Sequence, residues 1–121
     1  MLLQLLRVKI QQLIVSESSE SYPGSISLPN DLIEASGLKM FELVHVNNLA
    51  TGSRILTYVV PAKKAGYVSL NGAASKHFSK GDKIHIIAFG YYSDEEAENH
   101  RPVIVYADEN NKLIESKTYS F

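Results

Sequence analysis

The tetrapeptide Tyr22-Pro23-Gly24-Ser25 contains residue types that could do covalent chemistry without help from any other group. In a tight turn, a serine hydroxyl can attack the carbonyl carbon of the preceding residue, which moves the acyl group from nitrogen to oxygen and leaves an ester. β-Elimination of that ester leaves dehydroalanine, which hydrolyses to a pyruvoyl group and ammonia. Pro-Gly is also the usual composition of a type II turn, so the tetrapeptide alone fits an ordinary turn as well.

Arg54 and Tyr58 have side chains that suit a small anionic ligand and a proton transfer. A guanidinium can hold a carboxylate through two parallel hydrogen bonds, and a phenol is a better acid than an aliphatic hydroxyl. In a strand at 54–60 the two residues share one face and lie about 13 Å apart, at about 3.3 Å per residue. Thr57 points to the opposite face. The side chains of Arg54 and Tyr58 could therefore converge on one ligand.

The segment Asn71-Gly72-Ala73-Ala74 follows a short predicted strand at 67–70. Its small side chains would let backbone amides come close to another group. The same residues would also suit a simple hairpin turn.

The composition is that of an ordinary globular protein, with 45% hydrophobic and 21% charged residues among 121. This length predicts one domain over residues 1–121 that buries its own core. The formal net charge of −1 argues against nucleic acid as the main partner, because phosphate neutralisation needs a clustered excess of Lys and Arg. The sequence has no cysteine, which excludes disulfides and zinc-thiolate sites and fits a reducing compartment.

The N-terminal stretch 1–15 is apolar but is interrupted by Arg7, Lys9 and two glutamines. It is predicted to be neither a signal peptide nor a membrane span, and a cytoplasmic location is the expectation. The four histidines share no close metal-ligand spacing, so no metal site is predicted. They are His45, His77, His85 and His100.

Alternating apolar and polar residues predict seven or so short strands, and two short helices have start or stop signals. Pro29-Asn30-Asp31 opens the first helix and Gly37 ends it, and the acidic run 94–98 begins the second. This mainly β pattern favours a small barrel over an open sheet. The predicted strands are residues 5–15, 25–28, 41–46, 54–60, 67–70, 83–92 and 102–106, with a helical turn before 78 and a final short pairing at 113–114.

With its motifs at 22–25, 54–58 and 71–74 in this order, the chain resembles the pyruvoyl-dependent aspartate 1-decarboxylases from about residue 5 to about residue 113. The resemblance implies a six- to seven-stranded double-psi β-barrel with short helices, and a homotetramer with active sites between neighbouring subunits. It also implies decarboxylation of L-aspartate at the α-carboxylate to β-alanine and carbon dioxide, for pantothenate and coenzyme A synthesis.

The resemblance assigns a role to each motif residue. Ser25 would become the covalent pyruvoyl cofactor, which forms a Schiff base with the substrate, and no metal is implied. Cleavage between Gly24 and Ser25 would give a small chain of residues 1–24 and a large chain of residues 25–121, with or without an accessory maturation protein. Thr57 would hold the Gly24 carbonyl during cleavage, and Tyr58 would donate the proton that replaces the lost carboxylate. The implied substrate-binding residues are Lys9, Arg54, Thr57, Asn71, Gly72, Ala73 and Ala74.

Two positions depart from the family pattern or fall where it varies. Gln11 stands where the family commonly has histidine two residues after the lysine, and an amide cannot carry a proton charge. Pro23 precedes the scissile pair, and its fixed φ bears on the strain of the Gly24-Ser25 bond.

Two alternatives stay open from the sequence. The segment 26–46 also resembles the swapped-hairpin barrels of regulators that bind DNA as dimers, although the near-neutral charge counts against a DNA-binding role. The other alternative is an unprocessed, inactive relative that keeps the barrel, and Gln11 makes this alternative worth testing.

Overall fold

The chain folds as a curled, mainly β sheet, as a computed structural model of residues 1–21 and 24–120 shows. Tyr22 and Pro23, the first half of the predicted turn, lie outside these described residues. Within them the sheet has nine strands, in the order β2-β6-β3-β5-β4-β7-β1-β8-β9. The strands are β1 (Leu2–Ile14), β2 (Glu17–Ser19), β3 (Ser25–Leu28), β4 (Leu43–Asn48), β5 (Arg54–Pro61), β6 (Ser69–Asn71), β7 (Lys83–Ser93), β8 (Val103–Ala107) and β9 (Leu113–Thr118).

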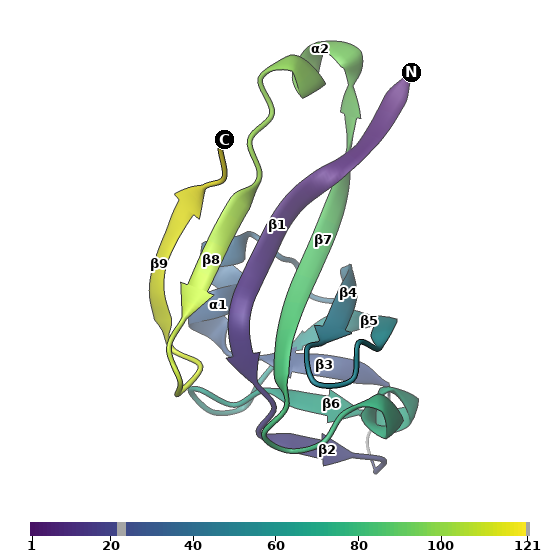
Figure 1. The fold of residues 1–121 in the computed structure, drawn as a ribbon, viewed down its shortest axis with the longest axis vertical. Helices are drawn as coiled ribbons and strands as arrows, with labels where there is room; N and C mark the ends of the chain where they lie inside the picture. Colours follow the sequence, from purple (N-terminus) through teal and green to yellow (C-terminus); the bar gives the residue numbers. More distant parts are fainter. Residues whose placement is uncertain (22–23, 121) are drawn as a thin grey trace.

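The sheet mixes parallel and antiparallel pairs and changes direction along its length. Strands β1 and β8, β2 and β6, and β3 and β5 pair in parallel, and the other neighbours are antiparallel. Figure 1 shows β1, β7, β8 and β9 along the long axis, while β2, β3 and β6 lie across them at one end. This curl agrees with the predicted small barrel.

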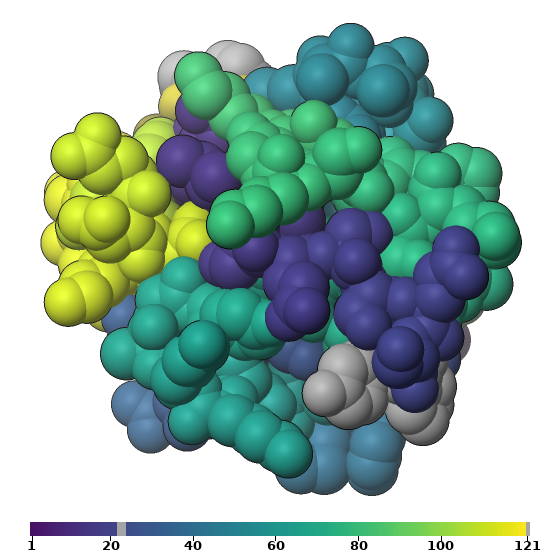
Figure 2. Space-filling view, turned by 90° about the horizontal axis from the view of Figure 1, so that it is seen from below, coloured from purple at the N-terminus to yellow at the C-terminus, as the bar shows by residue number. Residues whose placement is uncertain are grey.

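Backbone hydrogen bonds after β1 tie the two directions of the sheet together. The amide of Val15 donates to the carbonyl of Asp82 at 2.9 Å, and the amide of Ser16 donates to the carbonyl of Val68 at 2.7 Å. Figure 2 looks at this end and shows the N-terminal segment, in purple, between the teal, green and yellow segments. Residues far apart in the chain therefore close this end of the barrel.

Alternation along the strands explains the core. In β1, Val8 and Ile10 are buried while Lys9 between them is half-buried, and in β7 the buried residues are Ile84 and Ile86. The other fully buried large side chains come from all parts of the sheet and from the first helix, and burial of each contributes about 1.5–3 kcal/mol. They include Leu13, Val15, Ile26, Leu28, Leu32, Val44, Val46 and Leu70.

The short helices follow their predicted signals. Helix α1 (Asn30–Ser36) begins after Pro29 and ends at Gly37, whose φ of 72° is left-handed. Helix α2 (Asp94–Glu98) begins with a capping box in which Ser93 accepts from the Glu96 amide and the Glu96 carboxylate accepts from the Ser93 amide. None of the helices in the described part of the chain is long and apolar enough to cross a membrane.

Two local features of the strands were not predicted, for identifiable reasons. The strand predicted from residue 41 begins at Leu43, because Phe41 takes a left-handed φ of 71° that a strand does not accommodate. Strand β2 lies in a polar run and forms only by pairing with β6. The helical turn predicted before Phe78 is present as a 3₁₀-helix, η1 (Gly72–His77).

Gly66 marks the tightest backbone approach among the glycines whose surroundings the structure describes. A Cβ built on it would lie 2.5 Å from the Asn110 carbonyl oxygen, and its φ is +68°. Gly52 has a similar φ of +80° with nothing within 4 Å. We predict that Gly52→Ala costs about 1–2 kcal/mol of unfolding free energy from backbone strain alone. Gly66→Ala costs about 1–3 kcal/mol more because of the clash. Urea unfolding of both variants measures the difference, and equal losses would contradict it.

Candidate active site

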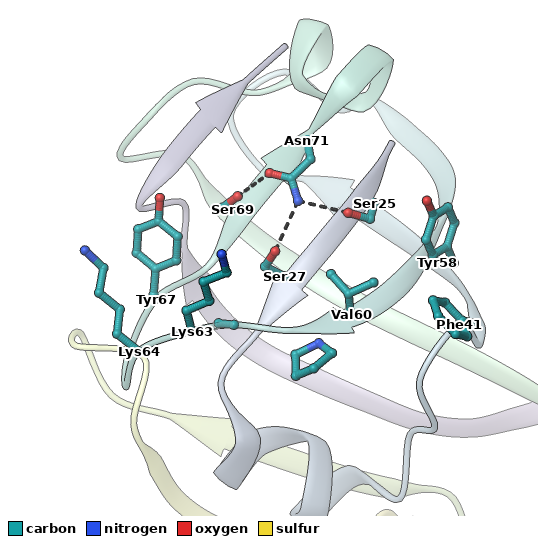
Figure 3. Close-up of a pocket in the computed structure, with 12 residues that line it drawn as sticks. Ser25, Ser27, Phe41, Tyr58, Val60, Lys63, Lys64, Tyr67, Ser69 and Asn71 are labelled. Carbon is teal, nitrogen blue, oxygen red and sulfur yellow. Dashed lines mark hydrogen bonds between the residues drawn. The ribbon is translucent and has the colours of Figure 1, made fainter. Parts of the chain in front are cut away.

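Ser25 is the first residue of β3 and is only 4% exposed. The Asn71 Nδ2 donates to the Ser25 Oγ at 2.9 Å and to the Ser27 Oγ at 3.1 Å. The Ser69 hydroxyl donates to the Oδ1 of the same Asn71 side chain. Figure 3 shows the amide at the centre of these three hydroxyls. One side chain therefore orients the buried Ser25 hydroxyl from the facing strand.

The strand register explains why these side chains meet. In the antiparallel pair of β3 and β6, Ser25 lies opposite Asn71, and Ser27 lies opposite Ser69. Residues i and i+2 of a strand share a face, so all four polar side chains gather on one side of the pair. Gly72 follows with a φ of 64°, which turns the chain from β6 into η1.

A cavity of about 610 Å³ opens beside Ser25. Tyr58 stands in it near Phe41, with ring centroids 6.2 Å apart, and Lys64 lies over the Tyr67 ring at 4.6 Å. The cavity combines the serine cluster with an apolar wall and two lysines, as Figure 3 shows. Its described lining residues are Ser25, Ser27, Phe41, Tyr58, Val60, Pro61, Ala62, Lys63, Lys64, Tyr67, Ser69 and Asn71.

The structure divides the residues that the sequence predicted for one site into two groups. Ser25, Tyr58 and Asn71 line the cavity together, and Gly72 to Ala74 follow directly in η1. Lys9 and Arg54 are not among its described lining residues. Gly24 precedes Ser25, and a Cβ on it would lie 3.9 Å from the Asn71 carbonyl oxygen, which is an ordinary contact.

Arg54 and Lys9 lie instead on the outer face of the sheet. Arg54 is exposed, and its Nε donates to the Asn47 Oδ1 at 2.6 Å across the hairpin of β4 and β5. Lys9 is half-buried on β1, between the inward-facing Val8 and Ile10. Thr57 lies on the other face of β5 from Arg54, opposite Val44, and does not line the cavity as described. Its expected contact with the Gly24 carbonyl stays a prediction.

The outer face near Arg54 is also apolar. Leu43 and Leu56 are 59% and 58% exposed, and Phe41 is 68% exposed. Leu43 pairs with Tyr58 and Leu56 pairs with His45, so these leucines lie on the same side of β4 and β5 as Arg54 and Tyr58. Large exposed apolar side chains on one side of two strands are typical of a surface that contacts another molecule.

Comparison with known proteins decides the family. A sequence profile of the aspartate decarboxylase family matches residues 1–114. The chain belongs to this family. Membership confirms the resemblance that the motifs carried and does not favour the DNA-binding alternative.

Relatives from several bacteria match nearly the whole chain. An aspartate 1-decarboxylase of Bdellovibrio bacteriovorus is 42% identical over 115 residues, which are 95% of this chain and 92% of that protein. One from Stenotrophomonas maltophilia is 40% identical over 112 residues, 92% of this chain and 89% of the relative. One from Carboxydothermus hydrogenoformans is 38% identical over 118 residues, 97% of this chain and 93% of the relative.

Several cavity residues escaped the sequence analysis. Ser27 and Ser69 were not singled out, and Asn71 was expected to act through its backbone, whereas its side chain holds Ser25. The signal was present as serine at i and i+2 in β3 and as Ser-x-Asn in β6, two polar pairs on otherwise apolar strands. The lysines at 63 and 64 had no signal beyond their charge. For the described residues, no group of three His, Cys, Asp or Glu side chains could hold a metal ion.

The polar cluster makes a prediction about stability. Asn71→Ala removes the amide from three buried or half-buried hydroxyls, whereas Ser27→Ala removes only one of the two bonds that Nδ2 donates. We expect Asn71→Ala to cost about 2–3 kcal/mol and Ser27→Ala about 1 kcal/mol, because unsatisfied buried polar groups are costly. Chemical denaturation of both variants and of the parent protein, each with Ser25 intact, gives the comparison. A loss for Ser27→Ala as large as that for Asn71→Ala would refute this role of the amide.

Proposed function

We propose that the protein is a pyruvoyl-dependent decarboxylase that converts L-aspartate to β-alanine and carbon dioxide. The observation that carries the proposal is the buried Ser25 hydroxyl, held by Asn71 at a cavity that also contains Tyr58. The names of the relatives support the substrate and the reaction. We further propose that it works in the cytoplasm, without a metal or a nucleic-acid partner.

The residues around Ser25 fit a pyruvoyl group formed from it. Ser25 is small, buried and on the cavity wall, and the Asn71 amide beside it offers N–H donors to a carbonyl oxygen. Gly24 brings no side chain against the scissile bond. A pyruvoyl group here supplies a ketone that condenses with the substrate's amine and accepts the electron pair released by decarboxylation.

Maturation uses this chain's own residues. The Ser25 Oγ attacks the Gly24 carbonyl carbon, the bond from that carbon to the Ser25 nitrogen breaks, and the nitrogen takes up the hydroxyl proton. Thr57 is assigned the donor to the Gly24 oxygen, where a hydrogen bond would stabilise the developing negative charge. The shift leaves an ester that still joins the two residues. β-Elimination then removes the Ser25 α-proton and breaks the Cβ–Oγ bond, which leaves a C-terminal carboxylate on Gly24 and dehydroalanine at position 25. Water hydrolyses the dehydroalanine to a pyruvoyl group and ammonia, so the products are residues 1–24 and residues 25–121. The accessory maturation protein, if one acts, would assist this step.

Tyr58 is assigned the proton transfer after carbon dioxide leaves. Its phenol stands in the same cavity as Ser25, packed near Phe41. A positioned acid of this kind contributes typically about 10²–10⁴-fold to a reaction rate. Val60 and Pro61 give this cavity an apolar wall beside the phenol.

Lys9 and Arg54 would bind the carboxylates of the substrate from a neighbouring subunit. Both lie on the outer face of the sheet, away from their own cavity lining, and the exposed Leu43 and Leu56 lie on the same side of β4 and β5 as Arg54. When this face covers the Ser25 cavity of another subunit, both cations reach the substrate. The stronger grip should fall on the retained carboxylate, because ground-state stabilisation of the departing one would slow its loss. We therefore propose a homotetramer with shared active sites.

Intact mass and activity test the maturation and the chemistry together. We expect purified wild-type protein to give two fragments that break between Gly24 and Ser25, with a pyruvoyl terminus on the larger one. Ser25→Ala should abolish both cleavage and β-alanine formation. Tyr58→Phe should still cleave but lose about 10²–10⁴-fold in turnover, while borohydride still traps aspartate on its large fragment. A wild-type chain that stays uncut under all conditions would support the unprocessed, inactive alternative.

Subunit mixing tests the shared site. Ser25→Ala and Arg54→Ala are each expected to be inactive alone. When the two are unfolded, mixed in equal amounts and refolded, roughly a quarter of the sites combine an intact Ser25 with an intact Arg54 if these residues come from neighbouring subunits. Activity near a quarter of refolded wild type is the expected result. No recovery from the mixture, with wild type refolding normally, would mean that both residues serve one chain's own site.

A further inference from the structure

A row of polar side chains crosses three strands on the outer face of the sheet. Asn47 on β4 is the cross-strand partner of Arg54 on β5 and of His85 on β7. The Asn47 Oδ1 accepts a hydrogen bond from the Arg54 Nε at 2.6 Å, so these two members of the row are in direct contact. His85 alternates with the buried Ile84 and Ile86 and therefore points to the same outer side.

A β-bulge extends the row to β1. Ile10 pairs with Ile86 and Leu13 pairs with Ile84, which leaves Gln11 and Gln12 together opposite the single residue His85. Bulges of this kind re-aim side chains and are common beside active sites. Position 11, where the family commonly has histidine, therefore faces a histidine that comes from a different strand.

Lys9 lies next to Gln11 and His85, and its positive charge affects the pKa of His85. Lys9 pairs with Ile87, two residues along β7 from His85 and on the same face. Burial first, and then the positive charge of Lys9, hold the pKa of His85 below its ordinary value. His85 is thus a neutral hydrogen-bonding group between the cations Lys9 and Arg54. Because it is uncharged at neutral pH, it adds no repulsion to that between the two cations.

Other titratable groups surround the row. Arg54 reaches it through Asn47, and the exposed Lys83 lies two residues from His85 on β7. His45 on β4 pairs with Ile87, and Tyr106 on β8 pairs with Gln11. The charged members among these are cations, so a negatively charged ligand is the natural occupant of the surface.

We propose that His85 is a positioning residue of a carboxylate-binding row formed with Lys9, Asn47 and Arg54, and that it supplies from β7 the imidazole that Gln11 does not supply from β1. The identity of the ligand as the substrate dicarboxylate rests on the proposed function; the row and the place of His85 in it do not. The departure at position 11 is then a relocation of the imidazole rather than its loss.

The proposal predicts the direction in which pH changes dicarboxylate binding. A carboxylate beside Lys9 offsets the repulsion that lowers the pKa of His85, so ligand binding raises that pKa toward its ordinary value of 6.5. By linkage, protonation of His85 strengthens carboxylate binding by the same factor by which carboxylate binding strengthens protonation of His85. Affinity for a dicarboxylate should therefore rise as the pH falls from alkaline values toward the pKa that His85 has in the ligand-free protein.

A titration that needs no catalysis gives the first test. The Ser25→Ala protein cannot mature, and succinate serves as a dicarboxylate without an amine. The histidine side chains of this protein are followed by NMR as a function of pH, with saturating succinate or with sodium chloride at equal ionic strength. The signal of His85 is identified as the one that disappears in His85→Gln. We expect succinate to raise the pKa of His85 by about 0.5 or more, a coupling of about threefold. The exposed His77 is the internal control and should not move.

Kinetics of the wild-type enzyme give the second test. His85→Gln keeps an amide in the row but removes the titrating group, so its KM for aspartate should exceed that of wild type about threefold at acidic pH and converge at alkaline pH. Adding Gln11→His to His85→Gln should restore the pH dependence, because the imidazole returns to the facing position across the bulge. His77→Gln is the matched control and should behave as wild type.

The outcomes separate this proposal from the proposed function. If succinate leaves the pKa of His85 unchanged, or if His85→Gln keeps the wild-type pH dependence of KM, His85 has no part in carboxylate binding even though the enzyme decarboxylates aspartate. If Gln11→His fails to restore the double variant, His85 does not stand in for position 11. A shift with succinate in a protein that never forms β-alanine would support the row and overturn the proposed function alone.

Discussion

The hydrogen bonds from the Asn71 side chain to Ser25 and Ser27 are the interaction on which the rest of the site depends. Strands β3 and β6 are only four and three residues long, so few backbone bonds hold them in register. Buried hydroxyls without partners would destabilise such a short pair, and one amide accepts from Ser69 while it donates to the other two serines. The same bonds that stabilise the strand pair therefore fix the direction of the Ser25 oxygen at the cavity.

The curl of the sheet then separates side chains that alternation places on one face. Arg54 and Tyr58 share a side of β5, yet Tyr58 lines the Ser25 cavity while Arg54 binds Asn47 on the neighbouring strand. Strand twist over four residues is enough to send the two side chains to different surroundings. A dicarboxylate needs cations as well as the reacting group, and the two cations assigned to substrate binding, Lys9 and Arg54, are not among the described residues that line the Ser25 cavity. The shared site that we propose follows from that separation.

The sequence predicted those parts of the fold that local signals control. Strand β3, helix α1 with its left-handed Gly37, and the acid-rich start of α2 were predicted from alternation and capping residues. Strand β2 was not, because its residues are polar and only the distant β6 makes them a strand. Phe41 shows the same limit, since nothing in its residue type indicates a left-handed φ. Of the proposed site, Ser25, Tyr58 and Asn71 do share one cavity, but the role of the Asn71 side chain needed the structure.

For the site residues, what the sequence lacked was the register between strands. Alternation tells which face a residue occupies, but not which residue stands opposite it on another strand. Asn47 and Arg54 are seven residues apart in one hairpin, so the turn between them fixes their pairing locally. Ser25 and Asn71 are separated by 46 residues, and only the antiparallel pairing of β3 with β6 brings them together. The pairing of Gln11 with His85 is harder still to predict, because at the bulge two residues of β1 lie opposite one residue of β7. A histidine absent at one position can therefore be present across the sheet, where the linear sequence gives no sign of it.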